Sequence, residues 1–87
     1  MKTLNDYFEK IYCINLDRRP DRWEESLKEF EKLNINVERV SAIDGQTIIP
    51  PTGFRYPVGA FALLLTHIQI IQNAIRNGYK NFLLFED

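Results

Sequence analysis

Three short apolar runs alternate with two stretches of helical periodicity along this chain of 87 residues. The first run, Lys10 to Leu16, is rich in β-formers and shows little alternation, which is typical of a strand covered on both faces in a parallel sheet. A second predicted strand covers Asn36 to Ile43, and a third covers Asn81 to Phe85. The pattern therefore predicts three strands separated by two helices.

The first predicted helix begins at Pro20, a residue that suits the first helical turn, and ends near Asn34. Its apolar face consists of Trp23, Leu27, Phe30 and Leu33. The second predicted helix runs from Val58 to Asn77 and ends at Gly78, which suits a left-handed cap. Its apolar stripe consists of Phe61, Leu64, Leu65, Ile68, Ile71 and Ile75. This stripe predicts a buried central helix.

The order strand, helix, strand, helix, strand predicts parallel pairing with right-handed crossovers. A helix on each face of the sheet requires the spatial strand order 2-1-3, so the predicted fold class is α/β with a three-stranded parallel Rossmann-like sheet. Residues 1–87 then form a single unit, and Gln46 to Pro57, rich in proline and glycine, is an ordered surface loop. A ligand crevice is expected between the carboxyl ends of strands one and three.

The charge balance argues against a nucleic-acid partner, because 11 basic and 12 acidic side chains leave a formal charge of -1. Cys13 is the single cysteine, and its place in an apolar run predicts a buried side chain in a reducing compartment. The longest apolar run, Ala60 to Leu65, is too short to span a bilayer, and the N-terminus lacks the features of a signal peptide. We therefore expect no transmembrane segment and a cytoplasmic location.

Charged residues follow the first and third predicted strands. Arg18 and Arg19 stand at a helix N-terminus, where their charge opposes the helix dipole, so anion binding is one reason for them and a solvated helix start is the other. Glu86 and Asp87 end the third strand, where adjacent carboxylates suit a divalent metal, although acids also occur at solvated strand ends. The two groups are expected to face one crevice.

Three further polar residues and the single histidine each have two possible roles, one structural and one functional. Asn15 and Asp17 either hold the turn after the first strand or contact a ligand. Asp44 either starts an Asp-Gly turn or accepts a hydrogen bond from a ligand. His67 lies on the flank of the second helix's apolar stripe, which favours a structural role over a catalytic one.

Four segments together resemble glycosyltransferase family 25, which includes bacterial lipooligosaccharide galactosyltransferases and collagen galactosyltransferases. They are Ile14-Asn-Leu-Asp-Arg-Arg-Pro-Asp-Arg22, Ala42-Ile-Asp-Gly45, Gly59 through His67, and Leu83-Leu-Phe-Glu-Asp87, and they span residues 11 to 87. The resemblance implies a GT-A-like fold that transfers a sugar, commonly galactose, from a UDP-sugar to an acceptor hydroxyl with inversion. The acceptor would be a glycan, a lipid-linked molecule or a protein.

The same resemblance implies roles for the candidate residues. Nucleotide-sugar contacts would fall to Asn15, Asp17, Arg18, Arg19 and Asp44. Glu86 and Asp87 would bind Mn²⁺ or Mg²⁺. The family's acidic pattern usually continues after the Glu-Asp pair, and the general base is expected beyond Asp87. We therefore interpret residues 1–87 as the N-terminal part of a transferase domain that binds without catalysing.

Two other function classes compete with this reading. A phosphoacceptor receiver domain shares the parallel sheet, but it needs acids after the first strand, where this chain has Asp17 followed by two arginines. A non-catalytic binding or assembly module derived from a transferase is the second alternative. The third strand, central in a larger sheet, would expose the edge of Phe82 to Phe85 here, so self-association is expected.

Overall fold

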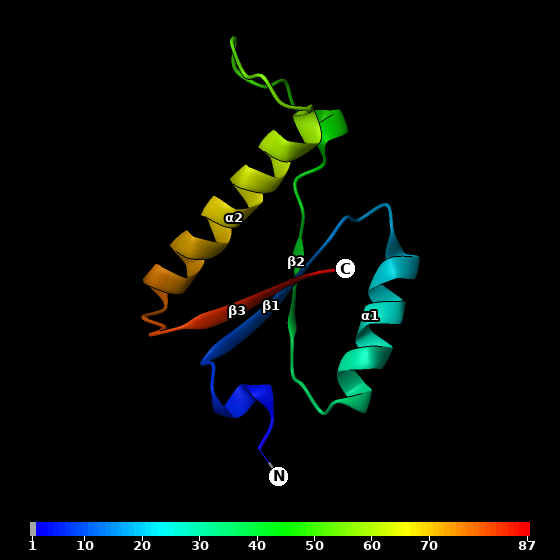
Figure 1. Ribbon diagram of the computed structural model, residues 1–87, viewed down its shortest axis with the longest axis vertical. Helices are drawn as coiled ribbons and strands as arrows, with labels where there is room; N and C mark the ends of the chain where they lie inside the picture. Colours follow the sequence, from blue (N-terminus) through cyan, green and yellow to red (C-terminus); the bar gives the residue numbers. More distant parts are fainter. Residues whose placement is uncertain (1) are drawn as a thin grey trace.

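The computed structural model describes residues 2–87. Its strands and longer helices are β1 (Lys10–Asn15), α1 (Pro20–Lys32), β2 (Glu38–Ser41), α2 (Val58–Arg76) and β3 (Phe82–Glu86). Two 3₁₀ turns add Leu4–Asp6 before β1 and Gly45–Thr47 after β2. The strands form one sheet in the order β2-β1-β3, and both pairings are parallel (Figure 1). The predicted α/β fold, strand order and helix positions are therefore confirmed.

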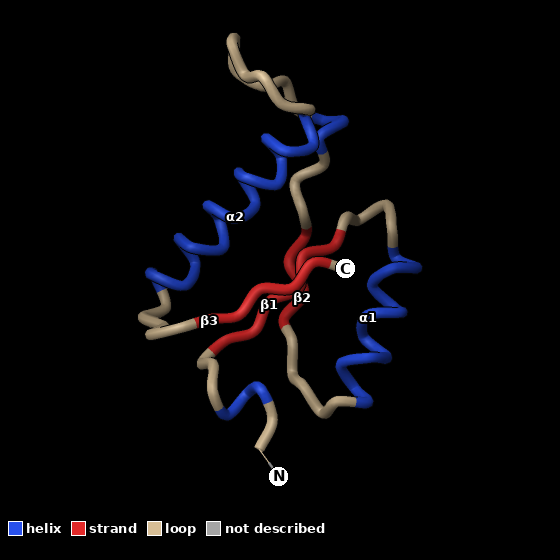
Figure 2. The backbone as a smooth tube through the Cα atoms, viewed as in Figure 1, coloured by secondary structure: helices blue, strands red, loops and turns tan. Residues whose placement is uncertain are grey.

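The sheet lies between the two helices, with α1 on one face and α2 on the other (Figure 2). Alternate residues of β1 supply the two halves of the core, because successive side chains of a strand point to opposite faces. Ile11 and Cys13 pack with Phe30 of α1, whereas Tyr12 and Ile14 pack with Ile70 of α2. This two-sided burial explains why β1 reads as an uninterrupted apolar run.

Cys13 is fully buried in the core beneath α1, as the sequence predicted. Removal from water disfavours the thiolate and, with the nearby negative charge of Asp87, raises the pKa of the thiol to about 11. The thiol therefore remains protonated near neutral pH and acts as a small apolar side chain.

Both helices end in the hydrogen-bonding pattern of a Schellman motif. After α1, Asn34 adopts a φ of 57°, and the N–H of Ile35 donates to the carbonyl of Phe30 at 2.9 Å. After α2, Gly78 adopts a φ of 70°, and the N–H of Tyr79 donates to the carbonyl of Ala74 at 3.1 Å. The predicted helix ends near Asn34 and at Gly78 are thus confirmed. In each case a residue in the left-handed conformation closes the last turn of the helix.

The predicted apolar face of α2 is wrong. The buried residues of this helix are Ala62, Thr66, Ile70 and Ala74. Four aliphatic residues of the predicted stripe are instead exposed, namely Leu64, Ile68, Ile71 and Ile75. The small side chains of the buried face allow close packing, and the Thr66 hydroxyl accepts a hydrogen bond from the N–H of Ile43 at 3.0 Å. Close packing of small side chains and this hydrogen bond set the rotation of the helix about its axis. The helix does not turn its largest apolar side chains toward the sheet.

Judged by length and composition alone, α2 is the one helix among residues 2–87 that is long and apolar enough to cross a bilayer. It exceeds the short apolar run considered from sequence because Thr66, His67 and the amide side chains interrupt that run without ending the helix. Core helices of soluble proteins share this composition, and Ile70 packs on Tyr12 and Ile14 of the sheet. The composition of α2 therefore carries no membrane assignment.

Candidate functional site

A cavity of about 380 Å³ lies at the carboxyl edge of the sheet. The ends of β1 and β3, residues 42–46 after β2 and the first turns of α2 line it. This is the edge where the sequence predicted a crevice, since the strand order reverses beside β1. Four charged residues predicted for the site line the cavity: Arg18, Asp44, Glu86 and Asp87.

One wall of the cavity depends on a close contact between two glycines. A Cβ added to Gly45 would lie 3.2 Å from the backbone N and Cα of Gly59, in the first turn of α2. Asp44 caps the 3₁₀ turn that follows, because its side chain accepts a hydrogen bond from the N–H of Gln46 at 2.9 Å. The Asp-Gly pair thus lets the chain after β2 pack directly against the start of α2.

Arg18 and Asp44 join the loop after β1 to the turn after β2. The Nε of Arg18 donates to Oδ2 of Asp44 at 2.7 Å, and the arginine is half exposed. The N–H of Gln46 and then the Arg18 guanidinium lower the pKa of the Asp44 carboxyl. One predicted cation and one predicted anion of the site are therefore paired with each other across the cavity rim.

Asn15, the last residue of β1, is 1% exposed, and its side chain is held at both ends. Its Nδ2 donates to the backbone carbonyl of Arg19 at 3.0 Å and to the carboxylate of Asp87. Its Oδ1 accepts a hydrogen bond from Nε of Arg39 at 3.0 Å. Asn15 is not among the residues that line the cavity.

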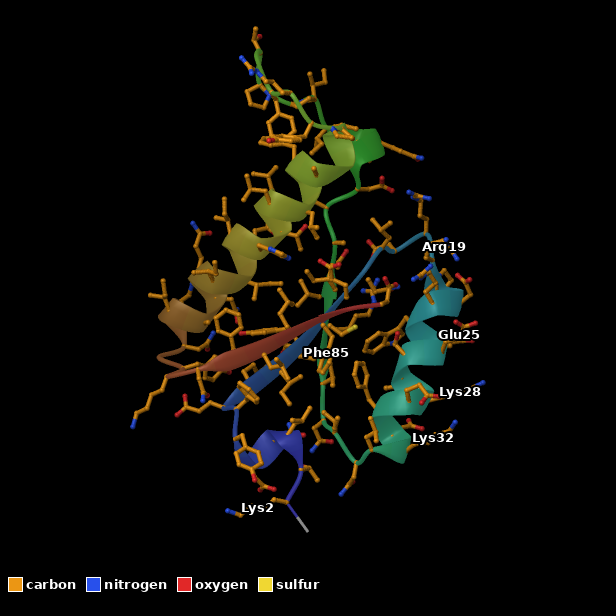
Figure 3. The ribbon with its side chains drawn as sticks, in the orientation of Figure 1. Lys2, Arg19, Glu25, Lys28, Lys32 and Phe85 are labelled. Carbon is orange, nitrogen blue, oxygen red and sulfur yellow. The ribbon has the colours of Figure 1, made fainter. Side chains whose placement is uncertain are left out.

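Asp17 and Arg19 also lie outside the cavity lining. Asp17 accepts hydrogen bonds from Nη2 of Arg39 at 2.7 Å and from the Ser41 hydroxyl at 2.8 Å, and these bonds lower the pKa of its carboxyl. Arg19 pairs with Asp21 at 3.1 Å. Figure 3 shows Arg19 at the amino end of α1, with Glu25, Lys28 and Lys32 further along the same helix. Both residues therefore anchor the turn between β1 and α1.

Glu86 and Asp87 are held separately although they are adjacent. Oε1 of Glu86 lies 3.6 Å from Nε2 of His67 on α2, whereas Asp87 is bound by Asn15. Asp87 also accepts a hydrogen bond at its backbone oxygen from Nη2 of Arg22 at 2.9 Å. The separation follows from the alternation of β3, since Leu84 packs on the α2 side of the sheet and Phe85 on the α1 side.

These two carboxylates fit a metal only as part of a larger ligand set. Among residues 2–87 there is no group of three His, Cys, Asp or Glu side chains that could hold an ion. Mg²⁺ is commonly bound by one or two carboxylates together with substrate phosphates and water. Glu86 and Asp87 both line the cavity and would supply only the protein's carboxylate share of such a ligand set.

Arg39 and His67 lie in this region although neither was predicted as a site residue. Arg39 lies inside the predicted second strand, where two adjacent charged residues, Glu38 and Arg39, interrupt the apolar positions and were the available signal. His67 was noted as structural, but its Nε2 is buried without a hydrogen-bond partner in residues 2–87 and faces Glu86. Only the three-dimensional pairing of β1 with β2 and of α2 with β3 reveals these contacts.

The bonds that Asp44 accepts from Gln46 and Arg18 predict a specific acid sensitivity. Since the folded state lowers the pKa of Asp44 from its ordinary 3.8, the unfolded chain binds more protons in acid. The contribution to stability is fully present above about pH 4 and is lost as the pH falls through the folded pKa. We expect Asp44→Asn to flatten the decline in the free energy of unfolding between about pH 5 and about pH 2. Urea titrations across this range measure it.

Glu24→Gln is the matched control for that titration, because Glu24 is exposed on α1 and its side chain forms no hydrogen bond or ion pair among residues 2–87. The free energy of unfolding of Glu24→Gln should decline in acid in the same way as that of the unaltered chain. An Asp44→Asn profile parallel to the control's would show that the bonds of the Asp44 carboxylate to Gln46 and Arg18 contribute nothing to the pH dependence of stability in acid.

The fold and this cavity define a Rossmann-like α/β half domain with a charged site at the strand ends. The family model described as glycosyltransferase family 25 (LPS biosynthesis protein) matches residues 8–51. The chain belongs to this family of glycosyltransferases. The resemblance read from the four sequence segments is therefore confirmed.

Curated relatives match over most of this chain. A glycosyltransferase 25 family member of Anopheles gambiae is 29% identical over 88% of the chain and 16% of its own length. A Drosophila melanogaster member is 27% identical over 91% of the chain and 16% of its own length. The mouse protein named inactive glycosyltransferase 25 family member 3 is 25% identical over 92% of the chain and 16% of its own length. No solved structure matches the chain significantly.

The chain thus spans 16% of the length of these relatives. The relatives include proteins named as family members and proteins named inactive, at similar identity. Membership of the family therefore does not separate an active transferase from an inactive one.

Proposed function

We propose that this chain is the donor-binding part of a glycosyltransferase that transfers a sugar, commonly galactose, from a UDP-sugar to an acceptor hydroxyl with inversion. The acceptor class is a glycan, a lipid-linked molecule or a protein. The observation that carries the proposal is the cavity at the carboxyl ends of three parallel strands, with an arginine and three carboxylates in its lining, in a chain of family 25.

The residues of the cavity suit the parts of a nucleotide sugar. Arg18 can exchange its bond to Asp44 for a diphosphate oxygen, because its guanidinium is half exposed and phosphate is a matched bidentate acceptor. Asp44, released in that exchange, becomes a hydrogen-bond acceptor for the ribose or the base. The apolar lining, which includes Leu16 and Leu63, can cover the less polar faces of the ligand.

The proposal assigns Glu86 and Asp87 to an Mn²⁺ or Mg²⁺ site that the diphosphate completes. A bound ion would supply neutralisation of the negative charge that develops on the departing diphosphate. The chain's own part is to hold the two carboxylates at the rigid end of β3. The proposal assigns no general base among residues 1–87, so this chain alone should bind the donor without turning it over.

Binding of UDP and UDP-sugars to the chain tests the proposal directly. With Mn²⁺ and saturating UDP, we expect the melting temperature to rise by about 5 °C or more, because ligand binding stabilises the folded state. Asp87→Asn should remove most of this shift, and Glu31→Gln, an exposed change on α1, should leave it intact. Absence of any shift with every UDP-sugar tried, with and without Mn²⁺, would refute the proposal.

A non-catalytic module is the second candidate, and the relatives named inactive favour it. Both candidates permit donor binding by residues 1–87, so the whole protein must decide between them. Release of free UDP from a UDP-sugar by the whole protein would support the transferase, whereas donor binding without turnover across a panel of acceptors would support the module.

We further propose that the chain of 87 residues self-associates through the outer edge of β3. Within residues 2–87, β3 pairs only with β1, so its other edge is open to a second strand. Sedimentation velocity should show a species larger than the 10.3 kDa monomer that grows with concentration.

The exposed aliphatic face of α2 is the competing contact surface. Ile71→Lys combined with Ile75→Lys places two positive charges on this face, beside the exposed Leu64 and Ile68, without altering β3. Association that survives this double change supports the edge of β3, and association lost with it would assign the contact to α2. A monomer at all concentrations would contradict self-association itself.

A further inference from the structure

We infer that Arg39 is a positioning residue that, through Asn15, holds the Asp87 carboxylate at the donor site. This inference rests on the proposed function and names a residue that the sequence motifs leave out. Arg39 lies on β2, two strands away from Asp87 on the far side of β1. The connection between them is one buried side chain, Asn15.

The guanidinium of Arg39 fixes which way the Asn15 amide points. Its Nε donates to Oδ1 of Asn15 at 3.0 Å, and its Nη2 donates to the backbone carbonyl of Asn15 at 3.3 Å. A guanidinium can only donate, so the amide must turn its oxygen toward β2. The amide nitrogen is then forced to the opposite side, toward β3.

On that side, both partners of the amide nitrogen can only accept. The nitrogen donates to the carbonyl of Arg19 at 3.0 Å and to Oδ2 of Asp87. If the amide rotated by half a turn, its oxygen would face these acceptors and its nitrogen would face the Arg39 donors, so all three bonds of the side-chain amide would be lost. The orientation of the amide is therefore set by donors on one side and acceptors on the other. Asp87 accepts a hydrogen bond from the Asn15 amide nitrogen, whose direction Arg39 fixes.

Arg39 is itself held in place, because Asp17 binds its Nη2 at 2.7 Å and Ser41 binds the same carboxylate oxygen at 2.8 Å. Asp17, the last residue of the Asn-Leu-Asp segment, therefore orients Arg39. Residues that orient a ligand of a metal or substrate commonly change affinity about 10-fold to 100-fold when they are replaced.

Arg39→Met tests the inference, since methionine keeps much of the apolar stem and removes the donors. Arg39→Lys is the conservative variant, which restores a donor without the fork that reaches Asn15 and Asp17 together. Arg76→Met, at the exposed end of α2, is the matched control. Far-UV circular dichroism identifies the variants that fold. If Arg39→Met does not fold, the Arg39→Lys variant still tests the inference.

The first readout does not depend on any ligand. In the ¹H–¹⁵N spectrum of the chain, the side-chain NH₂ of Asn15 should exchange slowly with water because both protons are bonded. Arg39→Met should speed this exchange by about 10-fold or more and move the backbone resonance of Asp87, and Arg39→Lys should lie in between. Unchanged exchange in the folded Arg39 variants would overturn the inference.

The second readout is the affinity for UDP in the presence of Mn²⁺, measured by calorimetry. Arg39→Met should weaken it by about 10-fold, Arg39→Lys by less, and Arg76→Met not at all. If the Asn15 signals change while the affinity stays the same, Arg39 has no role at the donor site and the inference is overturned. If the unaltered chain binds no UDP, the proposed function fails, and the spectrum still decides whether Arg39 aims the contact to Asp87.

Discussion

Replacement of Ile70 by alanine is expected to lower the free energy of unfolding by about 3 kcal/mol, whereas the same change at Ile71 should cost less than about 1 kcal/mol. Ile70 is 2% exposed and packs on Tyr12 and Ile14, so its truncation leaves a cavity against β1. Ile71 is 46% exposed on the outer side of α2. Urea unfolding of the two variants at one pH measures the difference.

The two variants control for each other. Both exchange isoleucine for alanine at neighbouring positions of one helix, so the gain in helix propensity is shared and cancels in the comparison. What remains is the difference in burial. Equal costs, or a larger cost at Ile71, would mean that α2 presents its large aliphatic stripe to the sheet and that the rotation described above is incorrect.

This comparison also locates the main failure of the sequence analysis. The periodicity of Leu64, Ile68 and Ile71 is genuine, but periodicity gives only the faces of a helix and does not say which face meets the sheet. The buried face includes Ala62 and Thr66, and a prediction based on the largest apolar side chains does not select these residues. Its polar anchor depends on Ile43, a residue 23 positions away in the sequence, and such a contact leaves no local pattern.

The parts that sequence reasoning predicted well are those set by local chemistry. The unbroken apolar run of β1 reflects its burial on both faces, and Gly78 closes α2 because glycine adopts the left-handed conformation without strain. The strand order followed from handedness rules that hold whatever the side chains are. The cavity, too, could be placed in advance, because it depends on where strand ends meet and not on particular contacts.

The partners within the site could not be predicted in the same way. From sequence, Arg18 and Asp17 both stand beside the expected crevice, yet one pairs with Asp44 on the rim and the other turns to Arg39. A guanidinium reaches several acceptors with a small change in side-chain angles, so neighbouring backbone geometry decides its partner. That geometry is fixed by the pairing register of β1 with β2, which the apolar pattern of a four-residue strand does not specify.

Substitution of Gly45 by valine is expected to destabilise the fold by about 2 kcal/mol, whereas Gly59→Ala should stabilise it by about 0.5 kcal/mol. A Cβ at Gly45 meets the backbone of Gly59 at 3.2 Å, and the branched valine side chain adds two further atoms in the same space. A Cβ at Gly59 meets no atom within 4 Å, and its helical backbone suits alanine. Two glycines in contact are thus predicted to respond with opposite signs.

The opposite signs make the pair diagnostic of the cavity wall. The backbone at Gly45 is not in the left-handed region, so conformational strain does not contribute and the cost comes from the close approach alone. Thermal unfolding measures both variants, and Gly78→Ala, at a φ of 70°, provides a reference for a loss caused by strain without crowding. If Gly45→Val unfolds at the same temperature as the unaltered chain, residues 42–46 do not pack against the start of α2. The cavity would then lack the wall that Gly45 and Gly59 form beside Asp44.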